Sequence, residues 1–406
     1  MRLEVLPAKK GDCLLVHCGT DAAPALILVD GGPAGVWKGT LLPRLERLRR
    51  ERGLGPEQPL HIDLVIVSHV DDDHINGVIG LLEHLKEKRD RRDPPPFTVG
   101  RLWHNAFDDV LGNDQVPGDA AAQFGVASVG SGADTDDACE PRAARDVAKL
   151  LASVEQGDRL RDLADALGIE VNGDFKGGII HSGAPTINDP GLGLRISVAG
   201  PRHDELLALQ AETDRWLRER ARKDAAAGSL LAALDDTSVA NLSSVVLLLR
   251  DAEGTLLLTG DARADKIKAG LADAGELQPE GTIHVDILKM QHHGSIRNVD
   301  GEFLRTVTAD TYVFSGDGKH GNPDRETFEL LFAERPGAAM TLVTTYPLDE
   351  IDAERAREHA KEQRKRAAKG KDAGADWDDA RDALGALLRP PPEGVIIVAP
   401  DGTPRT

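Results

Sequence analysis

Hydrophobic and polar positions follow two periodicities in the first hundred residues, one typical of strands and one of helices. Apolar runs with β-branched residues predict strands in "RLEVLPA" (2–8), "DCLLVHCG" (12–19) and "PALILVDGGP" (24–33). Leucines at helical spacing predict a helix in residues 40–53, and "VIGLLEHLKEKR" (78–89) predicts a second one. Between these helices, "HIDLVIVSH" (61–69) is a nearly continuous apolar run, as expected for a strand that is buried on both faces.

The remainder of the chain repeats this alternation, with polar segments between the strands. The segment "SSVVLLLRDAEGTLLLTGDA" (243–262) predicts a β-hairpin. Further strands are predicted in 97–107, 194–201, 284–290, 311–315, 339–346 and 394–403. We interpret residues of about 108–180 and 203–236 as insertions, and about 350–388 as a charged helical elaboration. The pattern therefore predicts one α/β domain over residues 1–406, with two sheets covered by helices.

Composition narrows the class of protein. The formal net charge of −19 argues against a general basic surface for nucleic acid. The basic runs 44–53 and 86–92 could still form a positive face, although an ordinary helix surface is the simpler interpretation. The three cysteines form no CxxC pair, and we find neither a signal-peptide core nor an apolar run of the roughly 18 residues that a membrane span needs. We expect a soluble, cytoplasmic protein that does not contact a membrane.

The segment "SHVDDDHING" (68–77) connects a predicted strand to a predicted helix, and it is either an acidic surface loop or part of a metal site. Two histidines flank three aspartates in it, and the adjacent Asp73 and His74 can reach two different ions. Two divalent ions held by such ligands form a known hydrolytic device. Asp72 should point away from them.

Other strand ends carry the same residue types. Asp261 ends "LLLTGD", His292 and His293 follow "DILKMQ", and His320 lies in "GKHGNP". In α/β folds ligands gather at the carboxyl ends of strands, so this shared placement favours a metal site over scattered core or surface histidines.

The motifs "SHVDDDHINGV", "TGD" and "HHGS", in this order, resemble the metallo-β-lactamase fold superfamily. The pattern HxDxDH replaces the usual HxHxDH, which is most similar to the metallo-hydrolase domain of the ComEC competence proteins and its soluble relatives. Supporting motifs are "GDCLLVHCG", "ILVDGG", "NLSSVVLLL" and "HGNPDRETFELL". The resemblance spans roughly residues 1–345 outside the insertions. It implies an αβ/βα four-layer sandwich with metals in a cleft at one edge.

The resemblance also implies a ligand set for two divalent ions, Zn or Mn. His69 and Asp71 would hold one ion, Asp73 and His74 the other, and Asp261 would bridge them. Either His292 or His293 would complete the second site, with the pattern favouring His293. A further histidine of the superfamily corresponds to a position near Asn241, so the first site is one histidine short; His203 is a possible substitute, although a surface position is favoured for it. Because carboxylate oxygen suits manganese, the carboxylate at position 71 predicts a site that accepts Mn²⁺ as readily as Zn²⁺.

Several groups in or beside the motifs could contact a substrate. The "HHGS" turn offers a possible oxyanion cradle with the Ser295 hydroxyl, and Lys289 could contact phosphate. His320 could act as a general acid, because the usual "GHP" of the ComEC-like pattern reads "GNP" here. Asn322 and His104 could line the same cleft.

These observations favour a metal-dependent hydrolase, a phosphodiesterase or nuclease that uses a metal-bridged hydroxide. Its catalytic residues would be Asp73, His320 and Ser295, and its substrate a phosphodiester, possibly nucleic acid. One alternative is a hydrolase of a small ester, lactone or nucleotide, which suits the acidic surface. The other is a non-catalytic binding module with a degraded metal site, to which Asn241 points. The sequence leaves the oligomeric state open.

Overall fold

The computed structural model describes residues 1–105, 142–204, 206, 244–398 and 404–405. Its first sheet has six strands in the order β1-β2-β3-β4-β5-β6. β1, β2 and β3 are antiparallel, whereas β3 to β6 run parallel. The strands are β1 (Arg2–Val5), β2 (Leu14–Thr20), β3 (Ala23–Val29), β4 (Leu60–Val67), β5 (Phe97–His104) and β6 (Glu170–Val171).

The second sheet has nine strands in the order β15-β14-β13-β12-β11-β10-β9-β8-β7. The strands from β10 to β14 are parallel, and the antiparallel pair β9–β10 is the predicted hairpin. The strands are β7 (Ile187–Asp189), β8 (Leu194–Gly200), β9 (Val246–Arg250), β10 (Thr255–Leu258), β11 (Ile283–Lys289), β12 (Val307–Phe314), β13 (Met340–Thr344), β14 (Val395–Val398) and β15 (Pro404–Arg405).

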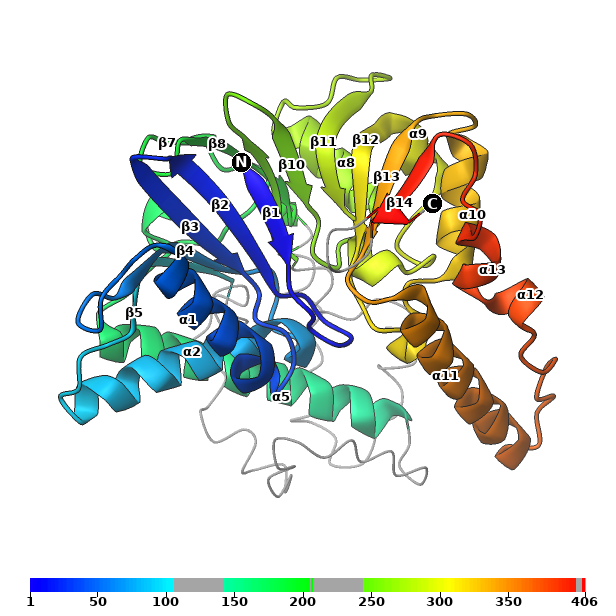
Figure 1. The fold of residues 1–406 in the computed structure, drawn as a ribbon, viewed down its shortest axis with the longest axis horizontal. Coiled ribbons are helices and arrows are strands. Elements are labelled where there is room, and N and C mark those ends of the chain that lie inside the picture. Colours follow the sequence, from blue (N-terminus) through cyan, green and yellow to red (C-terminus); the bar gives the residue numbers. More distant parts are fainter. Residues whose placement is uncertain (106–141, 205, 207–243, 399–403, 406) are drawn as a thin grey trace.

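Helices cover the outer face of each sheet (Figure 1). Over the first sheet lie α1 (Leu42–Glu51), α2 (Asp72–Asp90) and α5 (Arg142–Leu167). Over the second lie α8 (Ala264–Asp273), α9 (Gly301–Thr306), α10 (Arg325–Glu334), α11 (Leu348–Ala368) and α13 (Leu384–Leu388), and α12 (Asp379–Asp382) precedes α13. The prediction of two sheets covered by helices is confirmed.

The side-chain alternation of the strands produces these layers. In β3, Leu26 and Leu28 pack against the helices, whereas Ile27 and Val29 face the second sheet. β9 alternates in the same way across its own sheet. One apolar layer therefore lies between the two sheets, and one lies beneath each set of helices.

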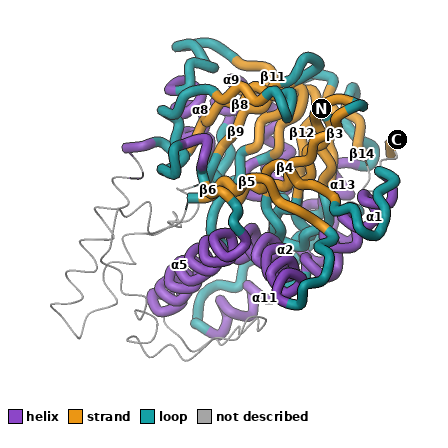
Figure 2. Tube along the Cα trace, turned by 90° about the vertical axis from the view of Figure 1, so that its left-hand side faces the viewer, coloured by secondary structure: helices purple, strands orange, loops and turns teal. Residues whose placement is uncertain are grey.

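The segment that we predicted as the first insertion contributes in part to this core. Leu160, Leu163 and Ala164 of α5 pack into the apolar layer of the first sheet, and α5 lies beside α2 (Figure 2). The first part of that insertion, residues 108–141, and nearly all of the second one lie outside the described residues. None of the helices described is long and apolar enough to cross a membrane.

Candidate metal centre

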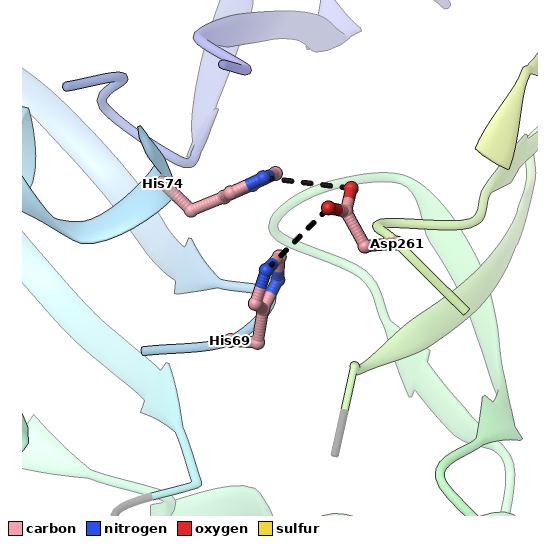
Figure 3. A group of neighbouring side chains, drawn as sticks. All are labelled: His69, His74 and Asp261. Atoms are coloured by element: carbon pink, nitrogen blue, oxygen red, sulfur yellow. Dashed lines mark ion pairs between the residues drawn. The ribbon is translucent and has the colours of Figure 1, made fainter. Parts of the chain in front are cut away.

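Histidines and aspartates from both sheets meet at one edge of the structure. His69 follows β4, His74 lies in the first turn of α2, and Asp261 follows β10 (Figure 3). His292 and His293 follow β11 in a short helical turn, η3 (Gln291–Gly294). Because β4, β10 and β11 each have parallel neighbours in their sheets, their carboxyl ends reach the same edge.

Asp261 lies at the centre of this cluster, and its two carboxylate oxygens face different histidines. Oδ1 is 3.5 Å from Nε2 of His74 and 3.7 Å from Nε2 of His293. Oδ2 is 3.7 Å from Nε2 of His69 and 3.5 Å from Nε2 of His292. A carboxylate in this position can bridge two cations, with one pair of histidines on each side.

Four polar atoms of the cluster are buried and have no hydrogen-bond partner within the described part of the chain. They are Nε2 of His69, Nε2 of His74, Nε2 of His293 and Oδ1 of Asp261. A buried polar atom without a partner costs about 1–3 kcal/mol, so a convergent set of them calls for a ligand. Because all four are atoms that bind cations, a divalent metal fits this set.

The other ring nitrogen of each histidine is held by a neighbouring side chain, as metal-binding histidines usually are. Such contacts fix the orientation of the ring and turn Nε2 toward Asp261. The Nδ1 contacts are His69 to Ser68 Oγ at 3.0 Å, His74 to Asp30 Oδ2 at 2.8 Å, His292 to Asn298 Oδ1 at 3.0 Å, and His293 to Ser315 Oγ at 2.9 Å.

The three aspartates at the start of α2 lie in different surroundings. Asp73 lies within 4.8 Å of His74 and His293, counted between potential ligand atoms. Asp71 places Oδ2 3.9 Å from Nε2 of His69. Asp72 is exposed and accepts hydrogen bonds from neighbouring amide side chains instead. Asp71 and Asp73 therefore extend the two halves of the cluster.

Charges within the cluster reinforce one another. Burial alone would raise the pKa of Asp261, but His292, His74 and His293 hold it well below its usual value. Burial would lower the pKa of His74, yet Asp261 and Asp30 raise it well above the usual value. The carboxylates around His74 therefore favour positive charge at this position, which a bound cation would supply.

Glycines bring Asp30 and His74 together. The amide of Gly31 donates to the carbonyl of His74 at 2.7 Å, and the amide of Gly77 donates to the carbonyl of Gly32 at 3.1 Å. A Cβ atom on Gly77 would lie 1.9 Å from the Gly31 carbonyl oxygen. The "DGG" turn after β3 can therefore approach α2 only because both surfaces lack side chains.

The turn after β11 has an uncommon backbone. His292 and His293 have φ values of 45° and 57°, in the left-handed region, and Gly294 follows with a φ of 89°. Such a conformation costs roughly 1–2 kcal/mol per non-glycine residue. The His292 amide donates to Gly260 at 3.1 Å, and the Asn322 side chain donates to the His292 carbonyl at 3.2 Å. The turn therefore directs two adjacent histidines toward Asp261 at a cost in conformational stability.

The structure corrects the predicted role of Lys289. Its side chain is 1 % exposed, and Nζ lies 2.7 Å from Oδ2 of Asp12. The other oxygen of Asp12 is 3.3 Å from Nδ1 of His293. Lys289 is thus buried beneath the cluster, where it holds Asp12 in place, and it is not accessible to a phosphate.

The structure also places the four other residues that we predicted to act on a substrate. Ser295 is buried and its amide donates to the His292 carbonyl, so the proposed oxyanion cradle lacks that donor. The side-chain amide of Asn322 donates to the same His292 carbonyl, so it is not free to contact a substrate. His104, at the end of β5, is buried, and burial, with a smaller effect of Arg161, lowers its pKa to about 3. His320 is exposed in η4 (Lys319–Gly321), and its catalytic role stays a prediction.

The structure also bears on the two residues proposed to complete the first site. Asn241 lies outside the described residues. His203 is exposed and its ring lies 4.8 Å from that of His181, between centroids. It belongs to none of the groups of potential ligands formed by the described residues. The sequence left open whether His292 or His293 is a metal ligand. In the structure, Nε2 of His292 and Nε2 of His293 lie 3.5 Å and 3.7 Å from the carboxylate oxygens of Asp261.

Sequence reasoning missed the residues that support the cluster from behind: Asp12, Asp30, Ser68, Asn298 and Ser315. The sequence did contain a pattern that could have identified Asp30. It follows an apolar strand and precedes two glycines, and Asp261 likewise follows a strand and a glycine.

No protein-family model matches the chain, and a search of curated proteins finds no match.

Proposed function

We propose that this chain is a metal-dependent hydrolase of the metallo-β-lactamase fold, with a dinuclear centre that acts on phosphodiesters. The observation that carries the proposal is the position of Asp261, whose two buried oxygens each face two histidines at 3.5–3.7 Å. The order of the sheets and the motif pattern HxDxDH support the same assignment.

The ligands divide into two sets around Asp261. His74, His293 and Asp73 would hold one ion with Oδ1, and His69, Asp71 and His292 would hold the other with Oδ2. In this assignment His292 takes the place of the histidine that the resemblance leaves missing near Asn241. When bound, two divalent ions would supply an activated water and would stabilise the charge that develops on the departing oxygen.

The chain's own residues define the side from which a substrate approaches. The side chains of His69, His74, His293 and Asp261 are at most 3 % exposed, whereas those of Asp71 and His292 are 32 % and 31 % exposed. The open side of the centre is therefore formed by Asp71 and His292. The exposed His320 is the residue we propose as proton donor to the leaving group.

Metal-dependent hydrolysis of bis-p-nitrophenyl phosphate tests the proposal, with Mn²⁺, Zn²⁺ and Mg²⁺ added in turn to the purified chain. Asp73→Ala should abolish hydrolysis, and Asp72→Ala should leave it unchanged, because Asp72 faces away from the cluster. Equal activity in both variants would assign the hydrolysis to a contaminant. Cleavage of esters or lactones alone would favour the small-substrate hydrolase, and failure to bind any metal would favour a non-catalytic module.

A further inference from the structure

The end of α11 carries a dense group of exposed cations. Residues 361–371 contain six lysines and arginines and one glutamate. Arg364, Arg366, Lys369 and Lys371 are all exposed, and none of them forms an ion pair with any residue the structure describes. We call residues 361–371 the basic end of α11.

The aspartates next to the basic end form no ion pair with Arg364, Arg366, Lys369 or Lys371 among the described residues. The segment that returns along α11 is rich in aspartate, but its carboxylates are engaged within that segment or by Gln363. Asp378 caps α12, Asp379 accepts from the Trp377 indole, and Asp382 pairs with Arg381. Asp372 accepts from the Gly374 amide, and Asp376 accepts from Gln363. Arg364, Arg366, Lys369 and Lys371 therefore have no ion-pair partner within the described part of the chain.

Stabilisation of the helix C-terminus does not explain why so many cations gather at the basic end either. The helix macrodipole amounts to roughly half a negative charge at the C-terminus, far less than the group of cations there. Arg364, Arg366, Lys369 and Lys371 lie in the last turns of α11 or within three residues of its end, so their like charges repel one another. A polyanionic partner would offset this repulsion.

The basic end of α2 shows what a neutralised run looks like. Its cations pair with their own neighbours, Lys86 with Asp90 at 2.6 Å and Arg91 with Glu87 at 2.6 Å. Lys88 likewise pairs with Asp93 at 3.3 Å. This run is an ordinary helix surface, which was the simpler interpretation of the sequence. Its cations are paired with acidic neighbours, unlike Arg364, Arg366, Lys369 and Lys371 of the basic end of α11.

A chain of contacts connects α11 to the metal centre. Nε of Arg355 donates to the Gly321 carbonyl at 3.1 Å, and the next residue, Asn322, donates to the His292 carbonyl at 3.2 Å. From Arg355 to Lys369 the helix rises about 20 Å. Figure 1 shows α11 extending outward from the two sheets, with its far end away from both of them.

We propose that the basic end of α11 binds the backbone of a polynucleotide whose scissile bond lies at the metal centre, an inference that rests on the proposed function. At about 3.4 Å per nucleotide along a duplex strand, the rise from Arg355 corresponds to roughly six nucleotides, so a mononucleotide cannot reach both places. Membrane-surface helices place large apolar residues beside their cations, whereas this end has Ala367, Ala368 and Gly370. Phosphates in a regular line suit it better than a lipid surface.

Binding of fluorescein-labelled DNA and RNA of about 30 nucleotides, single- and double-stranded, tests the inference by anisotropy on the full chain. The test variant replaces Arg364, Arg366, Lys369 and Lys371 by Gln. The matched control replaces Lys86, Lys88, Arg89 and Arg91 by Gln, which changes the net charge equally. We expect the test variant to bind about tenfold or more weakly, with a salt slope smaller by about 3, and the control to stay within about twofold.

Equal affinity of the test variant and the control would overturn the inference. So would binding to phosphatidylserine vesicles without binding to any oligonucleotide. Hydrolysis of bis-p-nitrophenyl phosphate needs no contact with α11, so a wild type that hydrolyses it but binds no polynucleotide overturns this inference alone. A wild type that hydrolyses no phosphodiester overturns the proposed function and this inference with it. Circular dichroism of each variant excludes unfolding as the cause of a loss.

Discussion

Nδ1 of His74 lies 2.8 Å from Oδ2 of Asp30, and this contact fixes the direction of the imidazole ring. Asp30 is itself held by Ser68, whose amide and hydroxyl each donate to it at 2.7 Å. All three side chains are buried. The ring of His74 therefore has one orientation, in which Nε2 faces Asp261.

Asp30→Asn should weaken metal binding by about 10–100-fold, because it removes the charge that orients His74 and makes it a stronger ligand. Competition with a chromogenic chelator measures the affinity. Asp63→Asn is the matched control, since Asp63 accepts a hydrogen bond from the Leu26 amide at 2.8 Å within the sheet. Equal affinity in the Asp30 variant and the wild type would contradict the role assigned to Asp30.

Lys289→Met should lower the free energy of unfolding by about 3–5 kcal/mol, because it leaves Asp12 buried without its cation. Urea denaturation measures the loss. The double variant Lys289→Met with Asp12→Asn should recover part of it, since the unpaired charge is then gone. Unchanged stability together with lost hydrolysis would show instead that Lys289 contacts the substrate.

Gly77→Ala should destabilise the protein by about 1–3 kcal/mol, although alanine normally favours a helix over glycine. The added Cβ would lie 1.9 Å from the Gly31 carbonyl oxygen and push the Asp30 turn away from α2. Gly39→Ala is the control, because a Cβ there would meet nothing within 4 Å. Thermal unfolding of both variants decides the matter, and stabilisation by both would contradict the close packing.

Glu4 should make stability depend on acid. Burial would raise its pKa, but hydrogen bonds from His17 and Arg44 outweigh burial and lower the pKa to about 2, from 4.5. A lowered pKa stabilises the fold above pH 4.5, and the gain is lost as the pH falls toward 2. The shift corresponds to at most about 3 kcal/mol, which solvent screening reduces to about 1–2.

Urea denaturation of wild type and Glu4→Gln at neutral pH and near pH 3 measures this contribution. The difference in unfolding free energy between the two proteins should be largest at neutral pH and should shrink in acid. A difference that stays constant between the two pH values would contradict the low pKa of Glu4.

The parts of the fold that repeat a simple pattern were predictable from the sequence. The apolar run before His69, the hairpin before Asp261 and the strand before His292 each predicted a strand end, and strand ends of parallel neighbours meet at one edge. Asp72 is exposed at the first position of α2, as we expected for a side chain that points away from the cluster. These features depend on local periodicity, which a sequence displays directly.

The roles of Lys289, Ser295 and His104 were not predictable, because burial depends on what packs against a residue from far along the chain. Lys289 meets Asp12 across 277 positions, and no local pattern indicates that pairing. The positive φ values of His292 and His293 likewise arise from contacts of the turn with Gly260 and Asn322. The sequence therefore identified the candidate metal ligands better than the residues that support those ligands from behind.

The metal content of the purified chain tests the account most directly. Elemental analysis of protein prepared without chelator and then equilibrated with Zn²⁺ or Mn²⁺ should give two divalent ions per chain for the wild type and for Asp72→Asn. Asp261→Asn should lose metal, because Asp261 contributes an oxygen to each half of the cluster. A single tightly held zinc with no uptake of Mn²⁺, or equal metal content in all three proteins, would contradict a dinuclear centre bridged by Asp261.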